Sequence, residues 1–192
     1  MTISEGSPST RPGGARTTLV TGTALLLALG VALPVVFHGF PLGGRIFLPM
    51  HLPAFIAGLV LGPLSGFVVG VASPVLSTLV TGRPPIFLMV PMVFEIGTYG
   101  LVAGLLRRRF GGARPGGARR WASSVYLPLV GAMIVGRAVW FAVVVWLAPV
   151  IGIQARSIAL ALGALGAGWI GMVIQLALIP PIVRAIERLR HA

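Results

Sequence analysis

The chain contains no cysteine and no lysine, and only three of its 192 residues are acidic. Without cysteine, disulfide bonds, thiol catalysis and cysteine-based zinc sites are excluded. Without lysine, a P-loop is excluded, so any ATP-driven step must be carried out by a partner chain. Charged residues make up 9% of the sequence, compared with about 25% in a typical soluble domain. With 56% hydrophobic residues, the chain is predicted to lie in a membrane.

Arginine supplies nearly all of the charge. Fifteen basic residues give a net charge of +12. Most of these arginines lie at the ends of apolar segments, where arginine contacts lipid headgroups and the cytoplasm. Membrane lipid is therefore predicted as a partner, and nucleic acid is not.

Apolar segments divide the chain into six predicted helices. Residues 1–16, rich in Ser, Pro, Gly and Arg, are predicted to form a disordered cytoplasmic tail before a membrane domain over 17–188. The first apolar segment is too long for the core of a signal peptide and is interpreted as a membrane span. The helices are predicted at 17–37, at two short segments within 51–82 separated by residues 62–66, at 87–106, at 125–148 and at 158–186.

The distribution of arginine predicts the topology. With six spans and a cytoplasmic amino terminus, eleven arginines are cytoplasmic, Arg137 lies within a helix, and three (Arg45, Arg83 and Arg156) lie outside. This is the asymmetry expected of a membrane protein. The predicted fold is therefore an all-α integral membrane bundle of six transmembrane helices with both termini cytoplasmic. A five-span alternative treats 51–82 as one kinked helix, but it places the arginine-rich loop outside.

Three polar side chains fall near the middle of predicted membrane helices: Glu95, Arg137 and Gln175. A charge there costs several kcal/mol unless it is paired or faces water, so such residues mark a candidate site. Tyr99 lies one helical turn after Glu95, and Trp140 lies one turn after Arg137. The group is interpreted either as a ligand pocket with aromatic walls or as an ion pair that only fixes helix packing.

His51 precedes an apolar segment without any other ionisable group, and we expect it at the outer mouth of the bundle. There it caps a short helix or reaches toward lipid headgroups. His51 and Glu95 are too few ligands, too widely spaced, to predict a metal site.

Small residues form one face of the first predicted helix. Ala24, Ala28 and Ala32 recur every four residues, a spacing that allows another helix to approach closely. This face either packs within the bundle or docks onto another membrane subunit.

The order of these features resembles a known family. Residues 48–106 contain the helix pair around "GLVLGPLSG", the short loop "TGRPP", and a Glu-containing helix that ends in "YGLVAGLL"; "GRAVW" follows at 136–140. Together with the alanine face, this order resembles the substrate-binding S component of energy-coupling factor (ECF) vitamin transporters over about residues 17–186. The resemblance implies a bundle in the bacterial cytoplasmic membrane that binds a vitamin or related micronutrient near its outer face.

The resemblance also implies partners and residue roles. A transmembrane coupling subunit would dock on Ala24, Ala28 and Ala32, and two cytoplasmic ATPases would supply the energy. His51 would lie at the lip of the pocket, and Arg45 and Arg83 would steer an anion or form a lid over it. Because arginine suits a carboxylate, small carboxylated vitamins such as niacin, pantothenate or folate are favoured. The expected substrate-binding residues are His51, Glu95, Tyr99, Arg137, Trp140 and Gln175.

Two other functional classes are considered. A structural or scaffolding membrane subunit without a small-molecule ligand would not need a charged pair in the middle of its helices. A membrane enzyme is not predicted, because no Ser/His, His/Asp or paired-carboxylate arrangement is visible. No cofactor or metal is predicted.

Overall fold

The computed structural model describes residues 12–37, 49–111, 118–147, 150 and 157–191. The helices of the described residues are α1 (Pro12–Phe37), α3 (His51–Ile56) with its π-helical continuation η1 (Ala57–Leu61), α4 (Pro63–Thr81), α5 (Ile86–Phe110), α6 (Ala118–Ala142) with its π-helical continuation η2 (Val143–Leu147), and α8 (Ser157–His191). Five helices in this part of the chain are long and apolar enough to cross a membrane. The predicted all-α membrane bundle is confirmed.

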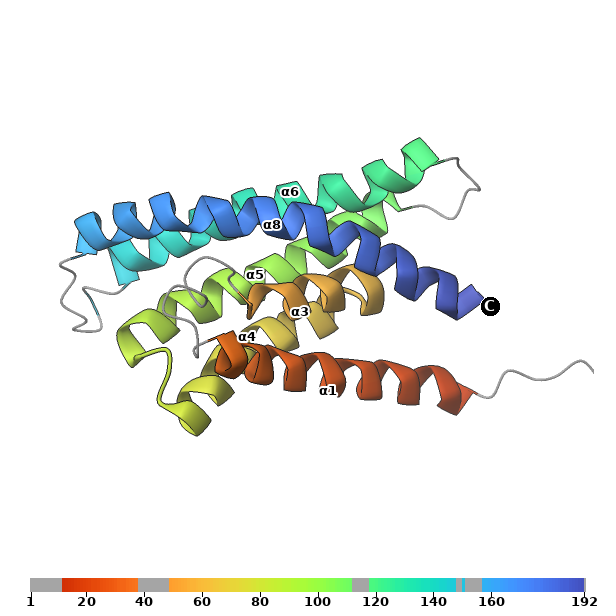
Figure 1. Cartoon of the computed structure of the whole chain (residues 1–192), viewed down its shortest axis with the longest axis horizontal. Coiled ribbons are helices and arrows are strands. Elements are labelled where there is room, and N and C mark those ends of the chain that lie inside the picture. Colours follow the sequence, from red (N-terminus) through yellow and green to blue (C-terminus); the bar gives the residue numbers. More distant parts are fainter. Residues whose placement is uncertain (1–11, 38–48, 112–117, 148–149, 151–156, 192) are drawn as a thin grey trace, which may run out of the picture.

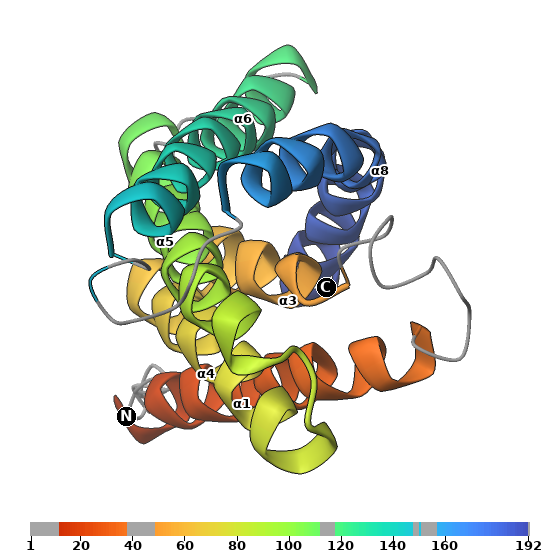
Figure 2. The ribbon, with the colours of Figure 1, turned by 90° about the vertical axis from the view of Figure 1, so that its left-hand side faces the viewer.

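The helices run back and forth along the long axis of the molecule, so the start of α1 and the end of α8 lie at the same end (Figure 1). Viewed along that axis, α6 and α8 lie on one side, α1 and α4 on the other, and α3 and α5 between them (Figure 2). The division of 51–82 into two helices is correct, because Gly62 adopts a φ of 112° between η1 and α4. The alternative of a single kinked helix is wrong, because a residue with this positive φ interrupts a right-handed helix. Glycine adopts such a backbone readily, which explains why the break lies at residue 62.

Several helices extend beyond the predicted apolar cores. The first helix begins at Pro12 rather than at residue 17, and proline is favoured in the first turn of a helix. The fourth predicted helix continues to Phe110 and carries Arg107, Arg108 and Arg109 in its last turn. Cations at a carboxyl-terminal helix end interact favourably with the helix dipole, so the basic residues prolong the helix instead of ending it. Residues 1–11 of the predicted tail lie outside the described part.

The segment His51–Leu61 is too short to span a bilayer. Its length corresponds to about 16 Å at 1.5 Å per residue, whereas the hydrocarbon core is about 30 Å thick. Five of the six residues of α3 are buried. The short helix therefore packs inside the bundle against the longer helices, and it brings its first residue, His51, into the interior.

Glycine allows α4 and α5 to pack backbone against backbone. A Cβ atom added to Gly100 would lie 2.2 Å from the carbonyl oxygen of Gly66, and one added to Gly66 would lie 2.5 Å from the carbonyl oxygen of Gly100. A Cβ on Gly58 would likewise lie 2.2 Å from the Gly100 oxygen. In lipid the hydrophobic effect does not drive helices together. Close van der Waals packing between small residues stabilises such crossings instead. The glycines thus allow α5 to cross α4 and η1 at close range.

Helix α5 contributes to both cores of the bundle. One core contains Phe55, Tyr99, Leu129 and Ile179 and joins α3, α5, α6 and α8. The other joins α3, α4 and α5 through residues such as Ile96, with Leu26 and Leu27 of α1 packed against it. Consecutive residues of α5 therefore face different neighbours, and Glu95, which precedes Ile96, lies at the centre of the molecule.

The two faces of α1 have different environments. The inner face packs on α4: the Thr23 hydroxyl donates to Ser65 Oγ at 2.9 Å, and Gly30 is buried beside Ser73. On the outer face, Ala24, Ala28 and Ala32 are all exposed. The alanine face therefore does not pack within the bundle and is free to contact another protein.

Candidate functional site

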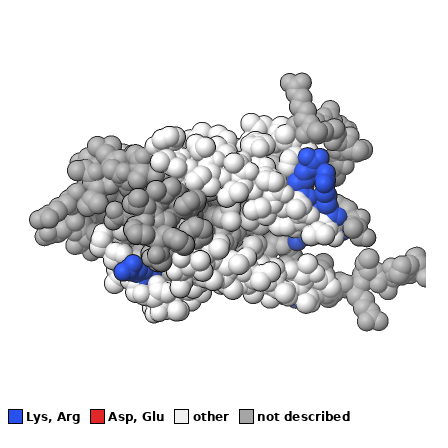
Figure 3. Space-filling model, in the orientation of Figure 1, with Lys and Arg blue, Asp and Glu red and all other residues white. Residues whose placement is uncertain are grey.

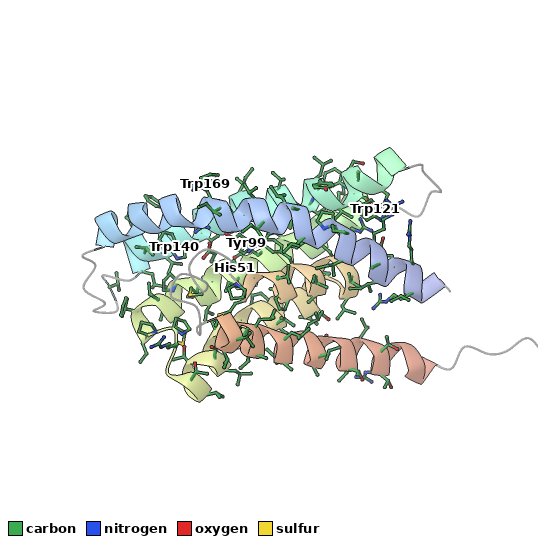
Figure 4. All side chains as sticks on the ribbon, viewed as in Figure 1. His51, Tyr99, Trp121, Trp140 and Trp169 are labelled. Atoms are coloured by element: carbon green, nitrogen blue, oxygen red, sulfur yellow. The ribbon has the colours of Figure 1, made fainter. Side chains whose placement is uncertain are left out.

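The buried carboxylate of Glu95 is the centre of a polar cluster. Glu95 is 3% exposed, and its Oε1 accepts a hydrogen bond from the Tyr99 hydroxyl at 2.7 Å. The same oxygen lies 3.2 Å from Nη1 of Arg137. Its other oxygen, Oε2, lies 3.9 Å from Nε2 of His51. The cluster therefore joins α3, α5 and α6 within the membrane-spanning part, and Figure 4 shows His51 and Tyr99 close together in the middle of the bundle.

Helix geometry and two glycines explain why these side chains meet. Glu95 and Tyr99 are four residues apart on one helix and are therefore neighbours on its surface. A Cβ added to Gly136 would lie 2.3 Å from the Tyr99 ring, so this glycine makes room for the tyrosine beside α6. A Cβ added to Gly168 would lie 2.8 Å from Nη2 of Arg137, so α8 also approaches the guanidinium closely. Neither glycine was predicted to belong to the site.

Aromatic rings enclose the cluster. Phe55 stacks on Tyr99 with ring centroids 4.8 Å apart and an interplanar angle of 24°. The His51 ring lies 5.4 Å from the Tyr99 ring at an angle of 47°. The guanidinium of Arg137 lies 6.0 Å from the centroid of Trp140, at the limit of a cation–π contact. Tyr99 and Trp140 thus lie beside the charged pair, as their helical spacing predicts, and Phe55 adds a third ring.

Several polar atoms of the cluster have no hydrogen-bond partner in the described part of the chain. They are Nδ1 of His51 and both Nε and Nη2 of Arg137, and all three are buried. An unsatisfied buried group costs about 1–3 kcal/mol. The arrangement can therefore bind a further polar group, to which the two arginine nitrogens can donate. Within the described residues, no group of three or more His, Cys, Asp or Glu side chains could hold a metal ion.

The structure corrects the predicted position of His51. The residue begins a short helix as expected, but it is only 2% exposed and faces Glu95 and Tyr99. Its side chain therefore does not reach lipid headgroups, and it does not cap α3, whose N-cap is Met50 and has no side-chain cap hydrogen bond. The sequence does not reveal its depth, because the length of the preceding loop does not determine where the chain re-enters the bundle.

The remaining predicted residues differ in their positions. Gln175 is 2% exposed on α8, one turn before Ile179, which shares a core with Tyr99. Arg83 is exposed in the connection between α4 and α5, and this connection lies at the opposite corner of the bundle from α6 and α8 (Figure 2). The structure thus does not bring Arg83 to the buried cluster. Arg45 lies outside the described residues.

A second, partly buried polar network was not predicted. Arg107 of α5 pairs with Glu187 of α8 and donates to Ser124 of α6. The Trp121 indole also donates to Glu187 at 2.8 Å. Glu187 is one of only three acidic residues in the chain, and its position among arginines near the carboxyl terminus was the available indication of this network.

The Glu95 cluster and the Arg107 network lie at different levels along the bundle axis. Figure 4 shows Trp121 far along the bundle from Trp140, near the end where α8 terminates. Arginine side chains gather at that same end on the face shown in Figure 3. The Arg107 network therefore ties α5, α6 and α8 together near the end where α1 begins and α8 terminates, and the Glu95 cluster lies farther along the bundle.

Most of the chain matches one known protein family. The model of the ECF transporter substrate-specific component matches residues 19–183. The chain belongs to this family. No curated protein and no solved structure matches it significantly. The resemblance inferred from the order of short motifs is confirmed, and this S component is a multi-pass cell-membrane protein and a subunit of a transporter.

Tyr99→Phe is expected to destabilise this S component by about 1.5–3 kcal/mol, the range for a hydrogen bond to a charged group. The change removes only the hydroxyl that donates to Glu95 and keeps the stacked ring. Tyr126→Phe is the matched control, because Tyr126 is 41% exposed; it should change stability by less than about 0.5 kcal/mol. Thermal unfolding of both purified variants measures the difference. Equal stabilities would contradict an energetic role for the Tyr99–Glu95 bond.

Proposed function

We propose that this S component is the substrate-capture subunit of an ATP-driven importer and that it binds a vitamin or related micronutrient from the outer side of the membrane. The proposed binding residues are His51, Glu95, Tyr99, Arg137, Trp140 and Gln175. The chain itself supplies the binding site, and a transmembrane coupling subunit with two cytoplasmic ATPases supplies the energy. A small carboxylated vitamin is the favoured substrate.

One observation carries this proposal: a charged, partly unsatisfied cluster lies among aromatic rings in the interior of a membrane bundle. A carboxylate and a guanidinium at this depth are costly. If the pair served packing alone, full pairing of its donors would be favourable, yet Nε and Nη2 of Arg137 lack partners within the described residues. Aromatic walls with a few convergent polar groups are typical of ligand sites.

Ligand-dependent stabilisation tests the proposal. The detergent-purified protein is screened against niacin, pantothenate, folate and other vitamins for a change in melting temperature. A ligand at 100 times its Kd stabilises the folded state by about 2.7 kcal/mol, so a specific ligand gives a clear, concentration-dependent shift. If no vitamin or micronutrient shifts the melting temperature, the alternative of a scaffolding subunit without a ligand is favoured instead.

The exposed face of α1 supports the proposed docking of the coupling subunit. Ala24, Ala28 and Ala32 are exposed, whereas Gly30 and Pro34 on the opposite side of the helix are buried. A partner helix can therefore approach the alanine face closely without any change inside the bundle. Because the cluster around Glu95 lies on other helices, docking and ligand binding are expected to be separable.

Ala28→Trp is expected to abolish uptake and co-purification with the coupling module while leaving ligand binding unchanged. The indole would occupy the space that a partner helix needs for close contact with the alanine face. Leu29→Trp is the matched control, since Leu29 is exposed on the same helix but lies about 100° around its axis from Ala28. Affinity purification measures complex formation, and cellular uptake measures transport. Normal uptake by Ala28→Trp cells would show that this face has no required partner.

A further inference from the structure

A groove between α6 and α8 has a lining that indicates which ligands can bind there. Its volume is about 630 Å³, within the range of about 300–1,000 Å³ that is typical of small-molecule pockets. It follows α6 from Val130 to Phe141 and α8 from Trp169 to Leu176. Among the described side chains that line it, Arg137 alone is charged and the others are apolar. The groove therefore offers one polar contact and a long apolar surface.

The groove opens on the outside of the bundle. Five of its side chains are exposed: Val130 (40%), Ile134 (66%), Phe141 (41%), Trp169 (57%) and Val173 (54%). Both helices have spans long and apolar enough to cross a membrane, so this surface faces lipid acyl chains. A molecule that occupies the groove is in contact with hydrocarbon along its length and must itself be mostly apolar.

Arg137 has one donor edge in use and another that is not. Its Nη1 faces Glu95, whereas Nε and Nη2 have no partner within the described residues. These two nitrogens share an edge of the planar guanidinium, and their N–H bonds point in the same direction. Such an edge matches the two oxygens of one carboxylate. Glu95 therefore compensates the charge of Arg137 without using the bidentate edge.

The surroundings of Arg137 connect that edge to the groove. Nη2 lies beside Gly168 of α8, where a Cβ atom would come within 2.8 Å. Both nitrogens are covered in this structure, and 16% of the Arg137 side chain is exposed. Contact between this edge and a carboxylate in the groove therefore requires the guanidinium to turn toward the groove. Glycine at position 168 leaves room for Nη2 beside the α8 backbone.

We infer that the ligand of this S component is an amphiphile, with an apolar or aromatic body in the α6–α8 groove and a carboxylate on Nε and Nη2 of Arg137. The inference rests on the proposed function and narrows its substrate class. Ligands with large polar bodies, such as pantothenate and folate, do not match a groove lined by Ile134, Phe141 and Trp169. A carboxylate on a flat aromatic or aliphatic body does.

A series of carboxylates with increasing apolar area tests this inference. The protein in nanodiscs of zwitterionic lipid is titrated with acetate, nicotinate and 2-naphthoate, and tryptophan fluorescence reports binding because Trp169 lines the groove. We expect Kd to fall by about tenfold or more from nicotinate to 2-naphthoate as buried apolar area grows. The alcohol 2-naphthalenemethanol keeps the body without the carboxylate and should bind about tenfold more weakly or worse.

Variants locate the site. Ile134→Trp fills the groove and should raise the Kd of 2-naphthoate by about tenfold or more. Val135→Trp is the matched control, because Val135 is the adjacent residue, is 42% exposed and does not line the groove; its Kd should equal that of the parent protein. Melting curves without ligand check that both variants fold alike, and a destabilised Ile134→Trp is replaced by Val173→Trp.

Three results would overturn the inference in distinguishable ways. Equal affinity for the acid and the alcohol, unchanged in Arg137→Gln, would show that the groove only collects apolar molecules from the bilayer. A polar vitamin whose Kd is unaffected by Ile134→Trp and Val173→Trp would overturn the amphiphile and leave the proposed function standing. Binding of neither a vitamin nor any carboxylate would overturn both.

Discussion

Arg137→Gln is expected to weaken ligand binding by about 10- to 150-fold and to destabilise the bundle by about 3–5 kcal/mol. The affinity loss corresponds to the 1.5–3 kcal/mol of a hydrogen bond to a charged group. The stability loss is that of a buried ion pair with one partner removed, because Glu95 would remain only 3% exposed without its cation. Titration with the identified ligand and thermal unfolding measure the two effects.

Two further variants separate ligand contact from helix packing. Arg107→Gln breaks the other described Arg–Glu pair, whose arginine side chain is 16% exposed, the same as that of Arg137. It should lower stability and leave ligand affinity unchanged, since that network lies at another depth. The double variant Glu95→Gln/Arg137→Gln should regain stability but not affinity. If the double variant binds ligand as the parent does, the pair serves packing only and the site assignment is wrong.

Gly100→Ala is expected to prevent stable folding, although it adds a single carbon atom. The new Cβ would lie 2.2 Å from the carbonyl oxygen of Gly66, so α4 and α5 would have to separate along their crossing. Such overpacking costs about 3 kcal/mol or more when the neighbour is backbone. The yield of monodisperse protein and its melting temperature in detergent measure the effect.

Gly14→Ala is the control for helix propensity. Alanine is favoured over glycine by about 1 kcal/mol in a helix, and this gain applies at both positions. A Cβ on Gly14 has nothing within 4 Å, so this variant should fold at least as well as the parent protein. Should Gly100→Ala match Gly14→Ala in yield and melting temperature, the close backbone packing of α4 and α5 would not be required.

The sequence predicted features that depend on local order. Hydropathy located the helices, and the Gly62-Pro63 dipeptide located the break between η1 and α4, because both act over a few residues. The neighbourhood of Glu95 and Tyr99 followed from helical spacing alone. The pairing of Glu95 with Arg137 was one of two interpretations, since a buried charge requires a partner and few were available in the membrane.

Features that depend on tertiary structure were not predictable in the same way. The burial of His51 depends on how deep the short helix sits, which no local pattern records. Phe55 was one of nine phenylalanines, and only the packing of α3 against α5 shows that it stacks on Tyr99. Gly168 matters because α8 passes next to Arg137. Arg83 was assigned to the mouth by topology, which gives the side of the membrane but not the position around the bundle.

The bond between Tyr99 and Glu95 also has a consequence during synthesis. Glu95 leaves the ribosome about 40 residues ahead of Arg137, which at about 5–20 residues per second is an interval of roughly 2–8 s. During that interval its final cation has not yet reached the membrane. Tyr99 is on the same helix and donates at 2.7 Å, and His51 has already been made. The nascent chain therefore carries its own temporary partner for the carboxylate, and insertion of α5 does not have to wait for α6.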